Sequence, residues 1–193
     1  MQLSKENWER REGVKFLKKV GIKSGQTVLD FGARVGHYSI PAAIIVGETG
    51  AIYALDKDPE ALEALKQKAA HLNLRNLNLI RTNGILKLDF KAESIDFVFL
   101  YDVLHYLKPE KRKMLYAEIY RILNPAGLLS VYPKHVLDDA PLDEFDRLHT
   151  DDVKQEIQNA NFKYIEKYCD SISHNDTLNY GCVLNFKRGE SRQ

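Results

Sequence analysis

Residues 28–36 constrain the fold of this chain more than any other stretch. They read as a buried strand that carries an acid, Asp30, and runs into a turn that begins at Gly32. A helix follows, and the next strand ends at a second acid, Asp56. An α/β sheet builds a nucleotide pocket from such a strand, turn and acid. Arg34 stands where the turn usually carries a second glycine, so the motif indicates a function and raises a question about it.

The bulk properties of the chain fit one globular domain. It has 193 residues, of which 44% are apolar and 28% charged, and its formal net charge of +1 gives no basic footprint for nucleic acid. The first residues lead into charged ones, so no signal peptide is expected. The longest apolar run, residues 42–46, is too short to span a bilayer. We expect a soluble, cytoplasmic protein.

The two cysteines and an acidic stretch bear on whether the chain has a metal or redox site. Cys169 and Cys182 lack the spacing of metal ligands, so free thiols in a reducing compartment are the simplest interpretation. Five acidic residues crowd the stretch 138–146, where a solvated acidic loop is favoured over a metal or a cationic substrate. We predict no metal site. The five acids are Asp138, Asp139, Asp143, Glu144 and Asp146.

Strand-like and helix-like segments alternate along most of the chain, which favours a parallel sheet covered on both faces. The expected helices span residues 5–20, 38–46, 59–72 and 109–123, and the expected strands span 27–31, 51–55, 77–81, 95–100 and 128–132, with a break at 124–127.

The pattern changes in the C-terminal part. A short helix is expected over 151–160, capped by Thr150, and two strands over 162–168 and 180–186 are joined by a polar turn. Consecutive strands without a helix between them predict an antiparallel hairpin that closes the sheet.

Ligands of open α/β sheets bind beyond the carboxyl ends of the strands, which here gathers the turn, Asp56, Asn83 and Tyr101 on one edge. Gly32 permits a sharp turn, and Gly36 should let the following helix approach closely. Asp56 lies about 20 residues beyond the glycines, where a carboxylate accepts hydrogen bonds from ribose hydroxyls.

Two cofactor types use this arrangement. A dinucleotide requires the turn G-x-G-x-x-G, which fails here because Arg34 and His37 occupy two of its glycine positions. S-adenosylmethionine carries a cationic amino acid part, which suits a carboxylate at Asp30, whereas that carboxylate would repel a pyrophosphate. The residues favour the methyl donor and disfavour an NAD(P)-dependent dehydrogenase.

Several motifs along the chain occur in the order and spacing of one family. The sequence resembles the class I (Rossmann-like) S-adenosylmethionine-dependent methyltransferases, and in particular their small single-domain members, over essentially its whole length. The matching pieces are residues 27–32 with Gly36, 52–56, 95–100, 103–105 and 119–129.

The resemblance implies an α/β fold, doubly wound, with a mostly parallel seven-stranded sheet whose last strand is antiparallel and inserted by the final hairpin. It implies one methyltransferase domain over residues 1–193. Within it, residues 1–24 would form an N-terminal helix covering the cleft, 25–133 the cofactor-binding core, and 134–193 the substrate-side loop, helix and closing hairpin.

The resemblance also implies a set of cofactor-binding residues. Those around the methionine part would be Asp30, Gly32, Arg34 and Gly36; Asp56 would bind the ribose, Lys57 would edge the adenine, Asn83 and Gly84 would face the adenine amino group, and Tyr101 would lie near the transferring methyl.

Three departures from the family pattern stand out: Arg34 replaces a glycine, Asn83 replaces a frequent acid, and Ala126 replaces a frequent glycine. An amide at Asn83 can still accept a hydrogen bond. The Arg34 side chain can point to solvent, can pair with the cofactor carboxylate or with Asp30, or can fill the pocket. We favour the first two readings, because an arginine can follow the glycine path if its φ stays negative.

The catalytic candidates are Tyr101, His105 and His135. A structural role for His105 is at least as well supported as that of a base. Asp102 is either a substrate ligand or a helix cap, and the cap is favoured. Trp8 either covers the cleft or packs in the core.

The function that we expect is transfer of a methyl group from S-adenosylmethionine to a small molecule, with S-adenosylhomocysteine as product. The alternatives are a regulatory pseudo-methyltransferase, suggested by Arg34 alone, and a nucleic-acid methyltransferase. Residues 100–103 lack the Asn/Asp-Pro-Pro-Tyr motif of base-modifying enzymes, so no nucleic-acid partner is expected, nor a membrane. The acceptor and the oligomeric state are not indicated.

Overall fold

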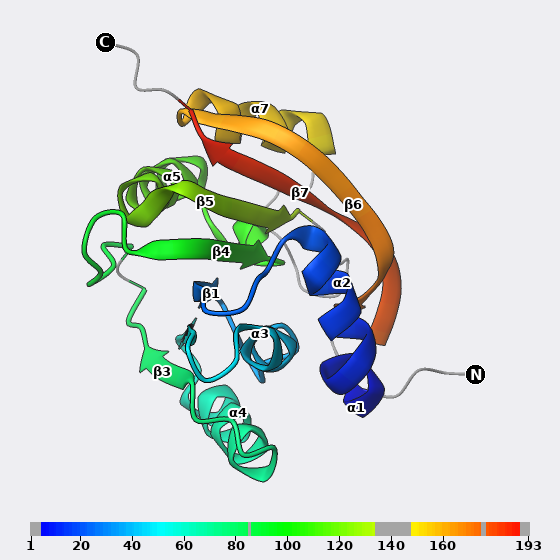
Figure 1. The fold of residues 1–193 in the computed structure, drawn as a ribbon. Helices are drawn as coiled ribbons and strands as arrows, with labels where there is room; N and C mark the ends of the chain where they lie inside the picture. The colour runs from blue at the N-terminus through cyan, green and yellow to red at the C-terminus, as the bar shows by residue number, and fades with distance from the viewer. Residues whose placement is uncertain (1–4, 85, 134–147, 175–176, 190–193) are drawn as a thin grey trace.

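The structure is a computed structural model that describes residues 5–84, 86–133, 148–174 and 177–189. A seven-stranded sheet in the order β3-β2-β1-β4-β5-β7-β6 forms its centre (Figure 1). The first five strands are parallel, and β7 runs antiparallel to both of its neighbours. The strands are β1 (Thr27–Phe31), β2 (Ala51–Asp56), β3 (Leu77–Arg81), β4 (Ile95–Tyr101), β5 (Leu123–Tyr132), β6 (Phe162–His174) and β7 (Thr177–Arg188).

Helices cover both faces of the sheet. Apolar side chains of α2, α3 and α4 pack on the face that carries Val28 and Ile52, and those of α5 and α7 pack on the face that carries Leu29 and Val98. The doubly wound α/β fold is therefore confirmed. The helices are α1 (Lys5–Asn7), the π-helical η1 (Trp8–Glu12), α2 (Gly13–Val20), α3 (Ser39–Val46), α4 (Pro59–His71), the 3₁₀-helical η2 (Leu104–Tyr106), α5 (Pro109–Ile122) and α7 (Thr150–Asn159).

Local chemistry explains several boundaries. Asp58 caps α4 by accepting a hydrogen bond from the Glu60 N–H (2.9 Å), and Pro59 stands at the first helical position. At α7 the expected cap is wrong. Thr150 is the first helical residue, and His149 precedes it and donates its N–H to Asp152 Oδ2 (2.8 Å).

The expected break at residues 124–127 is also wrong, because these residues belong to β5. Ile95 pairs with Leu123 and Phe97 with Leu128, so residues 124–127 form a bulge against β4. The Asn124 side chain bonds the Asp96 carboxylate and accepts from the Ala126 N–H (2.8 Å). A bulge accommodates the extra residues while the strand continues on both sides.

The final hairpin is confirmed and is longer than expected. β7 pairs with β5 over residues 129–131 alone, while β6 and β7 pair along nearly their whole length. The far part of the hairpin extends past the sheet alongside α2 (Figure 1), where Ile172 and Val183 are buried together with Phe16. We call residues 168–174 and 177–183 the hairpin arm.

The interpretation of the cysteines as free thiols is wrong in this structure. Cys169 of β6 lies directly opposite Cys182 of β7, and the two form a disulfide. Their separation along the chain gave no sign of this pairing, because it depends on the register of the hairpin. The disulfide links the two strands of the hairpin arm.

Candidate functional site

The turn after β1 is fastened to the end of β2 by backbone hydrogen bonds. The N–H groups of Gly32 and Ala33 both donate to the Leu55 carbonyl, at 2.8 and 2.9 Å. The Arg34 N–H donates to Asp56 Oδ2 (2.7 Å). Asp56 Oδ1 accepts from the Asp58 N–H (2.9 Å), so two backbone donors fix the orientation of this carboxylate.

Three residues of the turn adopt positive φ: Gly32 (86°), Arg34 (46°) and Gly36 (86°). The expectation that Arg34 would keep a negative φ is therefore wrong. Its backbone enters the left-handed region that a glycine adopts freely and other residues rarely adopt. The Arg34 side chain is exposed.

Gly36 has a different neighbour from the one expected. A Cβ at this position would overlap Leu65 Cδ1 on α4, while the expected close approach was that of the helix following the turn. The missing side chain thus allows α4 to pack against the turn. Both this overlap and the positive φ require glycine here.

Asp30 lies beneath the turn and is 3% exposed. Its Oδ2 accepts a hydrogen bond from Ser39 Oγ (2.6 Å). Burial raises the pKa of Asp30 to about 6, partly offset by the Ser39 hydrogen bond. A cation bound above the turn would favour the ionised carboxylate.

A cavity of about 110 Å³ opens between the turn, the end of β4 and the hairpin arm. Of the expected site residues, it is lined by Gly32, Arg34 and Tyr101. Asp30, Gly36 and Asp56 lie behind or beside it, and Lys57, Asn83 and Gly84 are exposed outside it. Among the described residues, the lining consists of Gly32, Ala33, Arg34, Val35, His37, Tyr38, Tyr101, Asp102, Tyr106 and Ser173.

Sequence reasoning missed six of the lining residues, which are Ala33, Val35, His37, Tyr38, Tyr106 and Ser173. His37 and Tyr38 directly follow the turn, so their position was a usable signal. Ser173 comes from the hairpin arm, and its carbonyl accepts a hydrogen bond from the Tyr38 hydroxyl (2.6 Å). A contact between residues so far apart in the chain has no local sequence signal.

Tyr101 contributes a ring to the cavity wall. Its hydroxyl pairs with Ser130 Oγ of β5 at 2.7 Å, and burial raises the pKa of the phenol well above its ordinary value. Its ring meets that of Tyr38 edge to face, with centroids 4.6 Å apart. A phenol that is held inside the sheet and resists ionisation is suited to shaping the cavity, and this geometry does not favour a proton acceptor.

Asp102 faces the cavity, whereas the catalytic candidate His105 does not line it. Asp102 lines the cavity, with φ of 56°, and His105 is buried behind it, with Nδ1 3.6 Å from Asp102 Oδ1. The cap reading of Asp102 is wrong, since Val103 holds the cap position of η2 and no side chain caps it. His135 and the acidic stretch 138–146 lie outside the described residues.

A family model described as a methyltransferase domain matches residues 28–127, just over half of the chain. The chain belongs to this family.

Curated relatives match only part of this chain. The demethylmenaquinone methyltransferase of Oceanobacillus iheyensis is 32% identical over 111 residues, covering 58% of this chain and 45% of the relative. A probable cobalt-precorrin-6B C(15)-methyltransferase (decarboxylating) of Saccharolobus solfataricus is 28% identical over 116 residues, covering 60% and 56%. The chain thus spans about half the length of these relatives.

Solved structures of low identity share the fold of the methyltransferase domain. A SAM-dependent methyltransferase from Aquifex aeolicus has a TM-score of 0.72 at 23% identity and covers 94% of this chain and 92% of that one. Magnesium protoporphyrin IX methyltransferase from Synechocystis, with bound SAM, has a TM-score of 0.68 at 16% identity, covering 96% and 79%. The class I methyltransferase fold is therefore confirmed.

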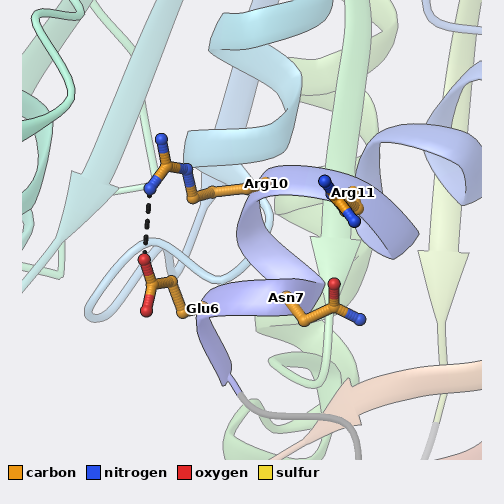
Figure 2. A pocket seen from close by; sticks show the side chains of 4 residues that line it. All are labelled: Glu6, Asn7, Arg10 and Arg11. Carbon is orange, nitrogen blue, oxygen red and sulfur yellow. Dashed lines mark hydrogen bonds and ion pairs between the residues drawn. The ribbon is translucent and has the colours of Figure 1, made fainter.

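The structure has a further hollow, of about 520 Å³, at the N-terminal helix (Figure 2). Glu6, Asn7, Arg10 and Arg11 line it, and Arg10 donates to Glu6 Oε1 (3.1 Å). None of the described residues at the carboxyl edge of the sheet lines this hollow, so we do not assign the site there.

The described residues contain no group of three or more His, Cys, Asp and Glu side chains arranged to hold a metal ion. Within the same residues, no helix has the length and apolar character needed to cross a membrane.

Proposed function

We propose that this chain transfers a methyl group from S-adenosylmethionine to a small-molecule acceptor and releases S-adenosylhomocysteine. The observation that carries the proposal is the hydrogen bond from the Arg34 N–H to Asp56. The bond joins the backbone of the turn to the acid at the end of β2, and the Arg34 side chain is exposed. Membership of the methyltransferase domain family supports the same reaction.

The residues at the edge of the sheet fit the parts of this cofactor. The cavity is smaller than the roughly 300–1,000 Å³ of whole-ligand pockets, so it suits the methionine end alone. Asp30 lies under that end. Each Asp56 oxygen accepts one backbone hydrogen bond and has a further lone pair for a ribose hydroxyl. Lys57, Asn83 and Gly84 lie on the open side, where we place the adenine.

When bound, S-adenosylmethionine supplies the electrophilic methyl group on its sulfonium. The chain has to orient the acceptor and exclude water, and the rings of Tyr38, Tyr101 and Tyr106 suit that task. We propose that Asp102, which directly follows β4, contacts the acceptor and that His105 supports it from behind. His135 stays a prediction.

A binding experiment tests the proposal. S-adenosylmethionine and S-adenosylhomocysteine should each raise the melting temperature, and NAD should not. A ligand at 100 times its Kd adds about 2.7 kcal/mol to the stability. The Asp56→Ala variant should lose most of the shift. Stabilisation by NAD alone would refute the proposal.

The relatives suggest the first acceptors to test. Their names refer to a demethylmenaquinone and a cobalt-precorrin, both small molecules, so we propose an acceptor of that class and no nucleic-acid substrate. Transfer of a labelled methyl group to these acceptors, and not to RNA or DNA, is the expected result. Binding of the cofactor without transfer to any class of acceptor would favour the pseudo-methyltransferase.

We keep a cytoplasmic location as a proposal. The Cys169–Cys182 disulfide tells against it, because disulfides persist mainly in oxidising compartments. Alkylation of the thiols at the moment of cell lysis, followed by mass spectrometry, distinguishes free thiols from a disulfide in the cell. Two alkylated cysteines in most molecules would support the cytoplasm.

A further inference from the structure

A buried polar cluster joins the N-terminal helix to the turn after β1. Glu9 of η1 is 7% exposed, and its Oε1 lies 2.6 Å from Lys68 Nζ of α4 and 3.2 Å from His37 Nδ1. One carboxylate oxygen thus contacts cations or potential cations from two separate segments. His37 lines the cavity of the candidate site.

The same segments hold the backbone of the turn at two further points. Lys68 Nζ donates to the Val35 carbonyl (3.1 Å), and the Trp8 indole N–H donates to the His37 carbonyl (2.9 Å). Val35 also lines the cavity. Trp8 is 1% exposed and its ring meets that of Tyr38 edge to face, so it packs in the core and at the same time fixes the turn.

The charge of Glu9 is maintained by this cluster. Burial alone would raise the pKa of Glu9, but the contacts with His37 and Lys68 outweigh it and lower the pKa below its ordinary value. Buried ion pairs contribute little to stability compared with apolar residues of similar size. Stability is therefore a weak explanation for a buried carboxylate at this position.

The backbone is irregular at the same place. Residues Trp8–Glu12 form a π-helical segment between α1 and α2, and the consecutive residues Trp8 and Glu9 are both buried. Such π-helical segments occur frequently at functional sites. The irregular turn is what presents both an indole and a carboxylate to the turn after β1.

We infer that Glu9 is a positioning residue for binding of the methyl donor. It orients the His37 imidazole and, through Lys68, holds the Val35 carbonyl, so the cavity wall is in place before the cofactor arrives. Ordering that wall only on binding would cost affinity. The inference rests on the proposed function.

The same helix offers a matched control. Glu6 pairs with Arg10 at 3.1 Å, with side chains 75% and 52% exposed (Figure 2). Glu6→Gln makes the same chemical change as Glu9→Gln, one turn away and in solvent. It should leave both the stability and the cofactor Kd unchanged.

The experiment measures the Kd of S-adenosylhomocysteine by calorimetry, well below the melting temperature, for wild type, E9Q, K68M, the E9Q/K68M double variant and E6Q. We expect E9Q to raise the Kd about tenfold, the scale on which supporting residues act. K68M leaves a buried carboxylate without its lysine and should melt lowest. The double variant removes both charges and should regain stability while its Kd stays about tenfold raised.

The double variant separates positioning from folding. A Kd within twofold of wild type for both E9Q and the double variant, with or without a lower melting temperature, would overturn the inference. Should E9Q fail to fold, the double variant alone carries the test. A wild type that binds no S-adenosylhomocysteine would instead overturn the proposed function.

Discussion

The turn after β1 and the hairpin arm both line the cavity, but they are held in different ways. The turn is fixed through its backbone: hydrogen bonds run to Leu55 and Asp56 at the end of β2, and three positive φ angles shape it. The hairpin arm depends on distant partners, namely the Tyr38–Ser173 hydrogen bond, packing on α2, and the disulfide. Adding a side chain at a packed glycine of the turn should therefore be severe, and single changes in the arm should be moderate.

The largest effect is expected for Gly36→Ala in the turn. The new Cβ would overlap Leu65, and alanine would be strained at a φ of 86°. Overpacking and backbone strain together should cost about 4 kcal/mol in urea unfolding.

Gly47→Ala is the matched control for this change. Gly47 also has a positive φ, of 67°, but a Cβ there meets nothing within 4 Å, so only backbone strain of about 1–3 kcal/mol is expected. Equal losses of stability in the two variants would mean that the overlap with Leu65 does not contribute to the effect.

The next effect is a gain in stability from Asp30→Asn. Because folding raises the pKa of Asp30 from 3.8 to about 6, its stabilising protonated form is fully present below pH 4 and is lost as the pH rises through 6. The uncharged variant should be more stable than wild type by up to about 3 kcal/mol at pH 7.5, and by almost nothing at pH 4.

The same variant should bind S-adenosylmethionine more weakly, because the cationic end loses its carboxylate. Urea unfolding at the two pH values checks the first expectation and calorimetry the second. A variant that is destabilised equally at both pH values would contradict burial as the cause of the raised pKa.

In the hairpin arm, the largest expected effect comes from removing the disulfide. It spans a sequence separation of 13 residues, and a loop of this size stabilises the folded state by about 2–3 kcal/mol. Urea unfolding with and without a reductant should differ by that amount in wild type, and not in C169S/C182S. A transition unchanged by reductant in wild type would mean that the cysteines are not paired in solution.

The smallest effect is expected for Arg34→Gly. Glycine relieves the positive φ of 46° but loses more conformational entropy on folding, so the stability should change by no more than about 1 kcal/mol. Since the side chain is exposed, the Kd of S-adenosylmethionine should stay within about threefold. A large gain in affinity would revive the reading in which the arginine obstructs the pocket.

The contrast between the turn and the hairpin arm also explains what could be predicted from the sequence. The turn, the Asp58 cap and the strands up to β5 each carry a pattern of neighbouring residues, and these patterns identified them. The bulge at 124–127 was missed because Pro and Gly in this stretch suggested the end of a strand. Instead, β5 accommodates them as extra residues in a bulge against β4 and continues. Ser173, Glu9 and the Cys169–Cys182 pair depend on long-range register and packing, which local periodicity does not encode.

The position of β7 has a consequence for the order of assembly. β7 is synthesised after β5 and β6, yet it lies between them in the sheet. While the chain emerges from the ribosome, β5 keeps an unpaired edge and β6 has no neighbour until Thr177–Arg188 arrives. Unpaired edges invite association between chains. A nascent chain stalled after β6 should therefore need chaperone protection, which the addition of one strand would relieve.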